Sequence, residues 1–472
     1  MSVSRSSAFR GSQSAADKER EMKLEELKNK IKRTACSVGL SEYEIYYSSE
    51  SSVSTETLKD EISSFSSGTH AGISFRCIVN GKMGYASTEL MTEDEMEALV
   101  TRAIDNATYQ DYDDEVFLYA GSKEYARVTA TPPEMPSAEE LKDAALAIQR
   151  ATYASSDKVT DGTQSSTFAF ETTISISNSY GLELTNHVGN VGCFAESVVK
   201  DGEDSQFSYE MAEGITPECY ANVSKMATER ALKKLGAATI PSGKYHVVFS
   251  NRAVASLLSS FWGVFSAKNA ELGLSLLKDK EGETVASPCV TIIDDPMREG
   301  CRIQTSFDSE GVAAYRKNVV ENGVLKTLLY DLATARKVEK ESTGNGLRGG
   351  YSGAVGIAPF NFYIAPSEEP LEELFRKAGE GALYVTALKG LHAGTNAVTG
   401  DFSVESEGFL VENGKEGKAI RSFTVSGNFF DLMKSIAAVG SDLYFGVPGG
   451  FTLFGAPSIL VKDMSVAGKD NE

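Results

Sequence analysis

The chain has 472 residues, which is too long for one hydrophobic core and suggests two or three domains. Its residues are 41% hydrophobic and 24% charged, a composition typical of globular proteins. It carries 66 acidic residues against 46 basic residues, which gives a formal net charge of −20. Proteins bind phosphate backbones mainly through Lys and Arg, so this balance argues against nucleic acid as the main ligand.

The cysteine pattern and the hydropathy indicate the compartment. The six cysteines show no CxxC motif and no short spacing, which favours reduced thiols over a disulfide framework. No apolar run reaches about 18 residues, so we expect no membrane-spanning segment. We therefore expect a cytoplasmic protein that binds neither membrane nor nucleic acid.

The N-terminus begins with a segment that has too few apolar residues to form a core. Residues 1–16 are rich in Ser, include Arg5 and Arg10 and contain no acidic residue, so we expect a disordered tail. The following residues, 17–39, have apolar side chains near helical spacing and predict an amphipathic helix.

Strands and a second helix complete an N-terminal α+β segment, which we assign to residues 17–130. Asn80-Gly81 predicts a hairpin turn, because both central residues of a type I′ turn need positive φ. Thr92 is the expected N-cap of a helix that ends near Ala107. The expected strands cover residues 44–54, 54–66 and 71–84.

A central α+β segment is expected over residues 131–240. Three prolines between residues 132 and 136 indicate a linker, and Ser137 with Glu140 forms a capping-box pattern at the start of a helix. Strand-like runs follow over residues 159–208, with a turn at 178–181. The last helix of the segment is expected over residues 217–235.

Residues 241–472 are expected to form a larger, β-rich C-terminal domain. A buried strand at 245–250 precedes an apolar stripe with helical spacing, which predicts one helix over residues 253–269. Asn413-Gly414 predicts a β-hairpin, and helical spacing returns over residues 430–437. The whole chain is therefore expected to be an α+β protein with mixed or antiparallel sheets, packed helices and an N-terminal α/β region.

Two further patterns are weaker. Residues 344–349 match GxGxxG, but a charged, helix-like run precedes them and a glycine-rich loop follows, so we reject a dinucleotide site. Asp294 and Asp295 could form a carboxylate pair for a metal or for acid–base chemistry. We favour a turn, because Asp-Pro after an apolar strand commonly starts one.

One loop brings His392, Asp401 and Ser403 close together in the sequence. We favour a structural role, in which these side chains form hydrogen bonds within the loop, as Asp and Ser commonly do. A catalytic triad is defined by geometry and not by sequence proximity. A stand-alone peptidase with an unrecognised site near His392 and Asp401 stays open as the alternative.

Three blocks in the last half of the chain carry a resemblance to a known family. They lie at residues 285–296 (VASPCVTIIDDP), 306–337 (SFDSEGVAAYRKNVVENGVLKTLLYDLATARK) and 392–442, where HAGTNAVTGDFSVESEGFLVENG is followed by TVSGNFFDLMKSIAAVGSD. The blocks resemble, in order, the TldD/PmbA (TldE) family. That family was first described as modulators of DNA gyrase and is regarded as related to metallopeptidases.

The resemblance also implies what the chain lacks. TldD-type members carry HExxxH on a helix, where two His bind zinc and the Glu acts as a general base. Alignment on the preceding leucine pair places Ser259, Ser260 and Val264 at these positions, and none can do that work. The four His (70, 187, 246 and 392) are at least 59 positions apart, so no local His pair replaces the motif. The chain resembles the PmbA/TldE-like branch, with no catalytic residue and no metal of its own.

The resemblance therefore implies a catalytically silent subunit that pairs with a TldD-like, zinc-bearing chain and acts on unfolded proteins or peptides. Activity is expected only with that partner, and a homodimer is an option for the isolated chain. Exposed strand edges can bind an extended peptide. Loops on rigid hairpins commonly carry binding residues. The candidates for contact with substrate or partner are His392, Asn396, Thr399, Asp401 and Ser403.

Overall fold

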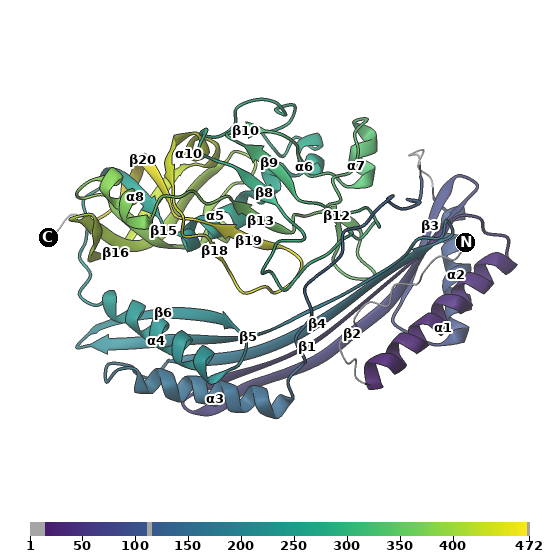
Figure 1. Cartoon of the computed structure of the whole chain (residues 1–472), viewed down its shortest axis with the longest axis horizontal. Coiled ribbons are helices and arrows are strands. Elements are labelled where there is room, and N and C mark those ends of the chain that lie inside the picture. The colour runs from purple at the N-terminus through teal and green to yellow at the C-terminus, as the bar shows by residue number, and fades with distance from the viewer. Residues whose placement is uncertain (1–14, 111–115, 470–472) are drawn as a thin grey trace, which may run out of the picture.

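A long antiparallel sheet underlies one side of the molecule in the computed structural model, which describes residues 15–110 and 116–469 (Figure 1). Its strands are β1 (Tyr43–Leu58), β2 (Glu61–Val79), β3 (Lys82–Thr88), β4 (Gln164–Asn178), β5 (Glu183–Asp201) and β6 (Asp204–Glu213). Their spatial order is β3-β2-β1-β4-β5-β6. Because β1 pairs with β4, strands from the expected N-terminal and central segments share this sheet.

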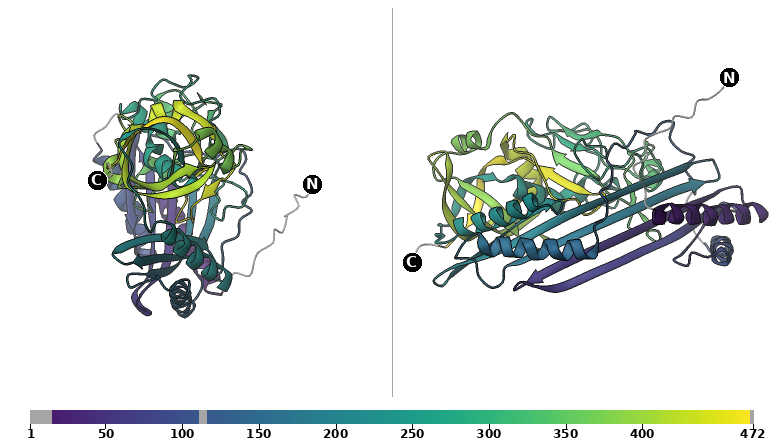
Figure 2. Two further views of the ribbon diagram at one scale, coloured as in Figure 1. Left: turned by 90° about the vertical axis from the view of Figure 1, so that its left-hand side faces the viewer. Right: turned by 60° about the horizontal axis from the view of Figure 1, so that its bottom comes forward.

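Helices cover one face of the sheet and the C-terminal domain covers the other (Figures 1 and 2). The alternation of side chains along a strand explains the two layers. Ile45 packs among residues of the helices, and its neighbour Tyr46 packs against Phe307 of the C-terminal domain. The helices are α1 (Ala15–Ser37), α2 (Glu93–Thr108), α3 (Ala138–Ala154) and α4 (Pro217–Lys233).

The helix starts follow the capping residues that the sequence predicts. Thr92 accepts a hydrogen bond from the Glu95 N–H, and Ser137 forms a reciprocal capping box with Glu140. Both predictions are confirmed. The expected tail lies mostly outside the described residues; its last two residues, 15 and 16, already belong to α1.

One expected strand division is wrong. The sequence suggested a strand over residues 54–66, but β1 runs on to Leu58 and β2 begins at Glu61. Lys59 and Asp60 form the turn with φ of 54° and 60°. Neither residue is the glycine that normally marks such a turn, so the signal was missed. The turn expected at Asn80-Gly81 is confirmed, with φ of 51° and 74°.

The C-terminal domain contains a sheet that closes on itself (Figure 2, left). Its strand order is β16-β15-β14-β7-β20-β17, and β16 also pairs with β20, which completes a ring. The expected hairpin is confirmed, with Asn413 and Gly414 at φ of 53° and 69°. The strands are β7 (Gly243–Phe249), β14 (Leu383–Lys389), β15 (Asp401–Glu412), β16 (Lys415–Asn428), β17 (Ile436–Val439) and β20 (Ile459–Ala467).

A second sheet and a short ladder complete the strands in the described part of this domain. The second sheet has the order β10-β9-β8-β13-β19-β18. Its strands are β8 (Ile292–Asp294), β9 (Lys317–Glu321), β10 (Val324–Leu325), β13 (Asn361–Ile364), β18 (Tyr444–Phe445) and β19 (Leu453–Ala456). The ladder joins β11 (Gly346–Arg348) to β12 (Val355–Ile357).

The helix expected over residues 253–269 is divided into three pieces. The apolar stripe is buried as predicted, and Phe261 stacks on Phe429 with ring centroids 4.6 Å apart. The helix is interrupted at Ser266, because this residue adopts an extended conformation and its side chain caps the helix that follows. The pieces are α5 (Asn251–Phe261), the 3₁₀ helix η1 (Trp262–Phe265) and α6 (Ala267–Glu271).

A second helix prediction, over residues 430–437, extends too far. Helix α10 ends at Ser435, and Ile436 begins β17, which pairs with β20. The strand pairing overrides the local helical spacing. The other short helices are α7 (Leu332–Lys337), α8 (Leu371–Ala378), α9 (Leu391–Gly394) and α10 (Phe429–Ser435). Across residues 15–110 and 116–469, no helix is both long enough and apolar enough to cross a bilayer.

Candidate functional site

Helix α5 and η1 hold the three positions that the resemblance aligned with a zinc motif. The start of α5 is well formed, because Ser250 accepts a hydrogen bond from the Ala253 N–H at 3.2 Å. Ser259 is exposed, and the Ser260 hydroxyl donates to the Ser256 carbonyl at 3.0 Å. Val264 is fully buried in the core. One position therefore faces solvent, one is bonded to its own helix and one packs among apolar side chains.

The four histidines lie on four different elements. His187 on β5 is 2.8 Å from the Thr173 hydroxyl, and His246 on β7 accepts a hydrogen bond from the Asp463 N–H at 3.3 Å. His70 lies on β2 and the exposed His392 on α9. Within the described residues, His, Cys, Asp and Glu form no group of three or more that could hold a metal ion.

The loop of residues 395–400 is held by its own hydrogen bonds. The Asn396 side chain accepts from the N–H groups of Val398 and Thr399 at 3.0 and 3.2 Å. Asn428 donates to the Asp401 carboxylate at 3.0 Å, and the bonds from Asn428 and Thr399 lower the pKa of Asp401. Ser403 pairs with Ser426 at 2.9 Å. These bonds agree with the interpretation of a structured loop.

The five loop candidates nevertheless share one property. The side chains of His392, Asn396, Thr399, Asp401 and Ser403 are all exposed. Asp401 and Ser403 lie on β15, whereas His392 lies on α9 and Asn396 and Thr399 lie in the loop between them. Their contact with a substrate or partner stays a prediction.

The two weaker sequence patterns, GxGxxG and the Asp294-Asp295 pair, form part of the fold and not a cofactor site. The GxGxxG segment contains β11 and leads to β12 rather than to a helix, so it is not a dinucleotide-binding turn. The Asp294 side chain is fully buried and accepts from Lys317 at 3.0 Å and from Asn345 at 2.8 Å. Asp295 accepts from the Met297 N–H at 3.1 Å, which confirms the expected turn.

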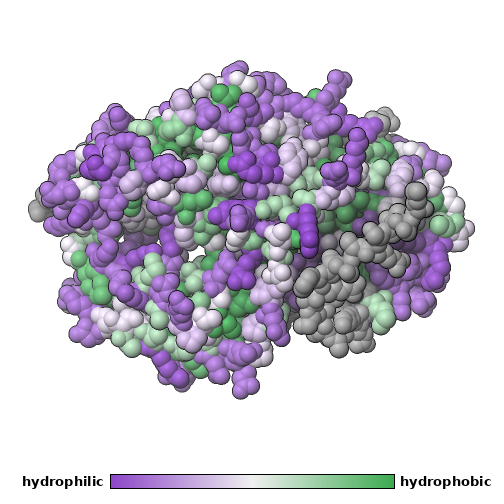
Figure 3. Space-filling model, viewed as in Figure 1, coloured by the Kyte–Doolittle hydropathy of each residue, from purple (hydrophilic) through white to green (hydrophobic). Residues whose placement is uncertain are grey.

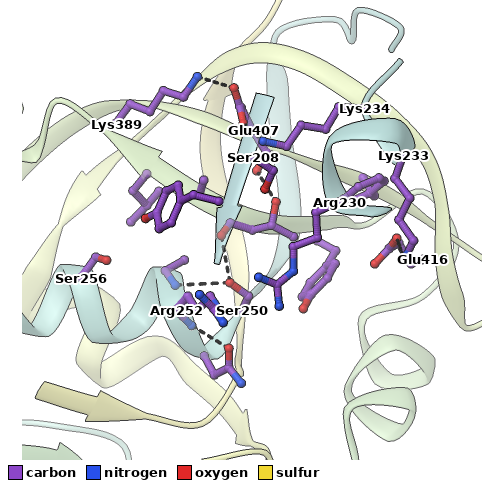
Figure 4. Close-up of a pocket in the computed structure, with 18 of the residues that line it drawn as sticks. Ser208, Arg230, Lys233, Lys234, Ser250, Arg252, Ser256, Lys389, Glu407 and Glu416 are labelled. Atoms are coloured by element: carbon purple, nitrogen blue, oxygen red, sulfur yellow. Dashed lines mark hydrogen bonds and ion pairs between the residues drawn. The ribbon is translucent and has the colours of Figure 1, made fainter. Parts of the chain in front are cut away.

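A cleft of about 410 Å³ lies where the long sheet meets the C-terminal domain (Figures 3 and 4). Strand β6 and helix α4 form one wall; the start of α5 with strands β14, β15 and β16 forms the other. Sequence reasoning missed it because its residues come from six separate elements of the chain. They include Phe207, Tyr209, Arg230, Lys233, Lys234, Arg252, Tyr384, Lys389, Glu407 and Glu416.

One buried carboxylate organises the arginines of the cleft. Glu210 on β6 has a side chain that is only 4% exposed. Its oxygens accept from Arg252 Nη2 at 2.6 and 2.9 Å, and one oxygen accepts from Arg230 Nη1 at 2.5 Å. The Arg252 guanidinium also lies 4.3 Å from the centre of the Tyr444 ring. The two guanidinium groups are therefore fixed relative to each other.

The lysines of the cleft share two other carboxylates. Lys234 donates to Glu407 at 2.8 Å, and Lys389 bonds the other oxygen of Glu407. Burial acts to raise the pKa of Glu407, but the hydrogen bonds and charges of the two lysines outweigh it and lower the pKa. Lys233 donates to Glu416 at 2.8 Å. Chemically, the cleft can bind anions and an extended apolar segment.

A second cluster of titratable groups is buried against the long sheet. Asp308 accepts hydrogen bonds from the N–H groups of Glu310, Val312 and Gly346 at 2.8 to 3.0 Å. Glu310 accepts from the Leu332 N–H at 2.8 Å. Burial raises the pKa of Asp308 to about 7; burial and the Asp308 charge raise the pKa of Glu310 to about 8.

Comparison with known proteins identifies the family. Three family models match in sequence order, described as PmbA/TldA metallopeptidase domain 1 (residues 43–107), central domain (131–235) and C-terminal domain (242–468). The chain belongs to the PmbA/TldD family. The cleft lies between the parts that match the central and C-terminal domains of this family.

Individual relatives agree with this assignment to the PmbA/TldD family. The chain is 28% identical to a metalloprotease of Methanocaldococcus jannaschii, over 83% of this chain and 88% of that protein. It is 26% identical to metalloprotease PmbA of Escherichia coli O157:H7, over 90% of this chain and 92% of that protein.

Solved structures show the same fold. A Thermotoga maritima protein, named as a candidate modulator of a DNA gyrase, is 31% identical with a TM-score of 0.85, over 94% of this chain and all of that protein. TldE of Thermococcus kodakarensis is similar in fold, with a TM-score of 0.83 and 21% identity, over 94% of this chain and 100% of that protein.

Proposed function

We propose that this chain is a PmbA/TldE-type, catalytically silent subunit of a zinc metallopeptidase complex that acts on unfolded proteins or peptides. The observation that supports the proposal is that α5 and η1 keep the helical structure but carry no zinc ligands at the motif positions. Helix α5 has its N-terminal cap and its buried apolar stripe, whereas the motif positions hold Ser259, Ser260 and Val264. Serine is a poor neutral ligand and valine is none, so these residues do not fit zinc.

The chemistry would then reside in a TldD-like partner that carries HExxxH. This chain would contribute shape and peptide contacts to a shared chamber. The exposed loop near His392 and the edge strand β6 are the surfaces that suit these roles. We place the complex in the cytoplasm, because all six cysteines are free thiols, as in proteins of reducing compartments.

A zinc measurement and a mixing experiment test the proposal. Elemental analysis of the purified chain should find no stoichiometric zinc, and the chain alone should not cleave a denatured substrate. Mixing it with an HExxxH-bearing relative should give cleavage that neither chain shows alone, and the two should co-elute on gel filtration. A Glu→Gln change in the partner's HExxxH should abolish the activity of the mixture.

The alternative is a stand-alone peptidase with a site near His392 and Asp401, two exposed polar residues of one loop. It predicts cleavage by the isolated chain that His392→Ala and Asp401→Asn abolish. One tightly bound zinc per chain, together with chelator-sensitive cleavage by the chain alone, would overturn the proposal of a silent subunit.

A further inference from the structure

We propose that the cleft between β6 and the C-terminal domain is a carboxylate-binding site that selects extended acidic peptides. Arg230 and Arg252 would bind the carboxylate, and the outward backbone groups of Tyr209 on the edge strand β6 would bind the peptide backbone. The inference rests on the proposed peptide-handling role and adds to it a location and a substrate preference. Three independent features of the cleft carry it: the fixed arginines, the local charge and the strand edge.

Glu210 holds both arginines in position and leaves some of their N–H donors unused. Glu210 engages only Nη1 of Arg230 and only Nη2 of Arg252. A guanidinium has five N–H donors in a rigid fork, so each arginine has an Nε–H and a second NH₂ group that no side chain or carbonyl of residues 15–110 and 116–469 accepts from. The two side chains are 34% and 27% exposed, so a ligand in the cleft can reach them. A fixed fork is the geometry that binds a carboxylate through two parallel bonds.

The local charge has the opposite sign to the charge of the whole chain. Five cations surround the cleft: Arg230, Lys233, Lys234, Arg252 and Lys389.

Three carboxylates, Glu210, Glu407 and Glu416, pair with these cations, and the half-exposed Glu405 lies 3.9 Å from Lys389. These five cations and four carboxylates leave one net positive charge at the cleft, in a protein with a net charge of −20. An anionic segment is attracted to this cleft and repelled by most of the remaining surface.

The third feature is the edge of β6, the outermost strand of its sheet. The Phe207 carbonyl accepts a hydrogen bond from Lys234 Nζ at 2.9 Å, so it points away from β5. Backbone groups alternate along an antiparallel strand, so those of Tyr209, two residues on, point the same way.

The aromatic side chains at this edge are also accessible. Phe207 and Tyr209 are 44% and 50% exposed. An extended peptide in the cleft would meet backbone groups, aromatic surface and cations together, which is the mode of recognition by strand addition. The chemistry of the ligand is thus a carboxylate carried on an extended chain.

Calorimetric titration of the isolated chain with unstructured peptides tests the proposal. The reference peptide has internal Glu residues and a free C-terminus; one control replaces each Glu by Gln, and another has an amidated C-terminus. The R230Q/R252Q variant should weaken binding of the reference peptide at least about tenfold, which corresponds to about 1.4 kcal/mol. Lys225→Gln, on the exposed face of α4, should leave the affinity unchanged.

The two peptide controls identify the source of the carboxylate. Weaker binding of the Gln peptide assigns the site to acidic side chains, and weaker binding of the amidated peptide assigns it to the C-terminus. The proposal of acidic-peptide selection is overturned if the Gln peptide binds as tightly as the reference peptide, or if R230Q/R252Q binds the reference peptide normally. Because that variant leaves Glu210 buried without a counter-charge, the triple variant with E210Q, which removes this carboxylate as well, is a second test and should also bind the reference peptide at least about tenfold more weakly.

The experiment separates this inference from the proposed function. Peptide binding by the isolated chain needs no partner and no zinc, so selective binding without activity in the mixture would contradict only the silent-subunit proposal. An active mixture in which R230Q/R252Q cleaves acidic and neutral substrates at the wild-type ratio would contradict only the carboxylate site.

Discussion

Glu44 on β1 accepts a hydrogen bond from Arg348 Nη2 at 2.9 Å, although 304 residues separate the two in the chain. The Glu44 side chain is fully buried and also accepts from Arg76 on β2 at 2.7 Å. The guanidinium of Arg348 lies 4.4 Å from the centre of the Tyr46 ring. This buried ion pair links the long sheet to the C-terminal domain.

Glu44→Gln should therefore lower the free energy of unfolding by about 3–5 kcal/mol, because it leaves the buried Arg348 and the partly buried Arg76 without their shared counter-charge. Urea denaturation measures the loss. The matched control is Lys225→Gln, since Lys225 and Glu229 form an exposed pair at 3.8 Å. That change should cost less than about 1 kcal/mol. Equal losses from the two changes would show that the Glu44 pair contributes no more than a surface contact.

The carboxyls of Asp308 and Glu310 should make stability depend on pH. Their pKa values in the fold, about 7 and about 8, lie above the unfolded values of about 4. The folded protein therefore binds protons that the unfolded chain has released. Their contribution to stability is complete below about pH 4 and is lost as pH rises through the folded values.

Glu310→Gln should remove part of this dependence, because the amide oxygen can still accept from the Leu332 N–H. We expect the free energy of unfolding of the wild type to fall by more than about 1 kcal/mol relative to the variant between pH 5 and pH 8. Denaturation at a series of pH values tests this. Parallel pH profiles for the two proteins would contradict it, and Glu229→Gln on the surface of α4 should reproduce the wild-type profile.

Gly84 on β3 is required by the close approach of α2. A Cβ atom at this position would lie 1.9 Å from the Ala103 carbonyl oxygen. Gly84→Ala should therefore destabilise the protein by about 1–3 kcal/mol, the usual range for an overpacked site. Gly349→Ala is the control, because its Cβ would have no atom within 4 Å. Thermal melting should show a clear fall for the first variant and little change for the second.

The exposed loop can be tested separately for structure and for function. Asn396→Ala removes two hydrogen bonds within the loop and should cost about 1 kcal/mol of stability. His392→Ala should leave stability unchanged, because the side chain is exposed. If the loop contacts substrate or partner, His392→Ala should still lower the activity of the mixture with an HExxxH-bearing relative. Full activity of this variant would exclude His392 from that role.

Several elements could be predicted from the sequence because their causes are local. The caps Thr92 and Ser137 act within three residues, and the Asn413-Gly414 turn depends on the φ preferences of two residues. The apolar stripe of α5 is visible as a helical period. The sequence alone shows that the chain contains no HExxxH motif, because its four His are at least 59 positions apart.

The errors arise where distant contacts override local preference. Residues 436–439 have helical spacing, yet they pair with β20 as a strand. The expected long helix breaks at Ser266, whose N–H bonds Gly263 and whose side chain caps α6. In each case the local free-energy difference between helix and strand is small, and tertiary packing decides.

The family, the absence of an HExxxH motif, most helix starts and the two Asn-Gly hairpins were thus determined by sequence alone. Only the tertiary structure decided which charges meet. Glu210 joins Arg230 and Arg252 from two different parts of the chain, and Glu44 joins Arg348. Such pairs depend on how two layers pack and on which carboxylates this packing buries. The spacing of residues in the sequence does not predict these contacts.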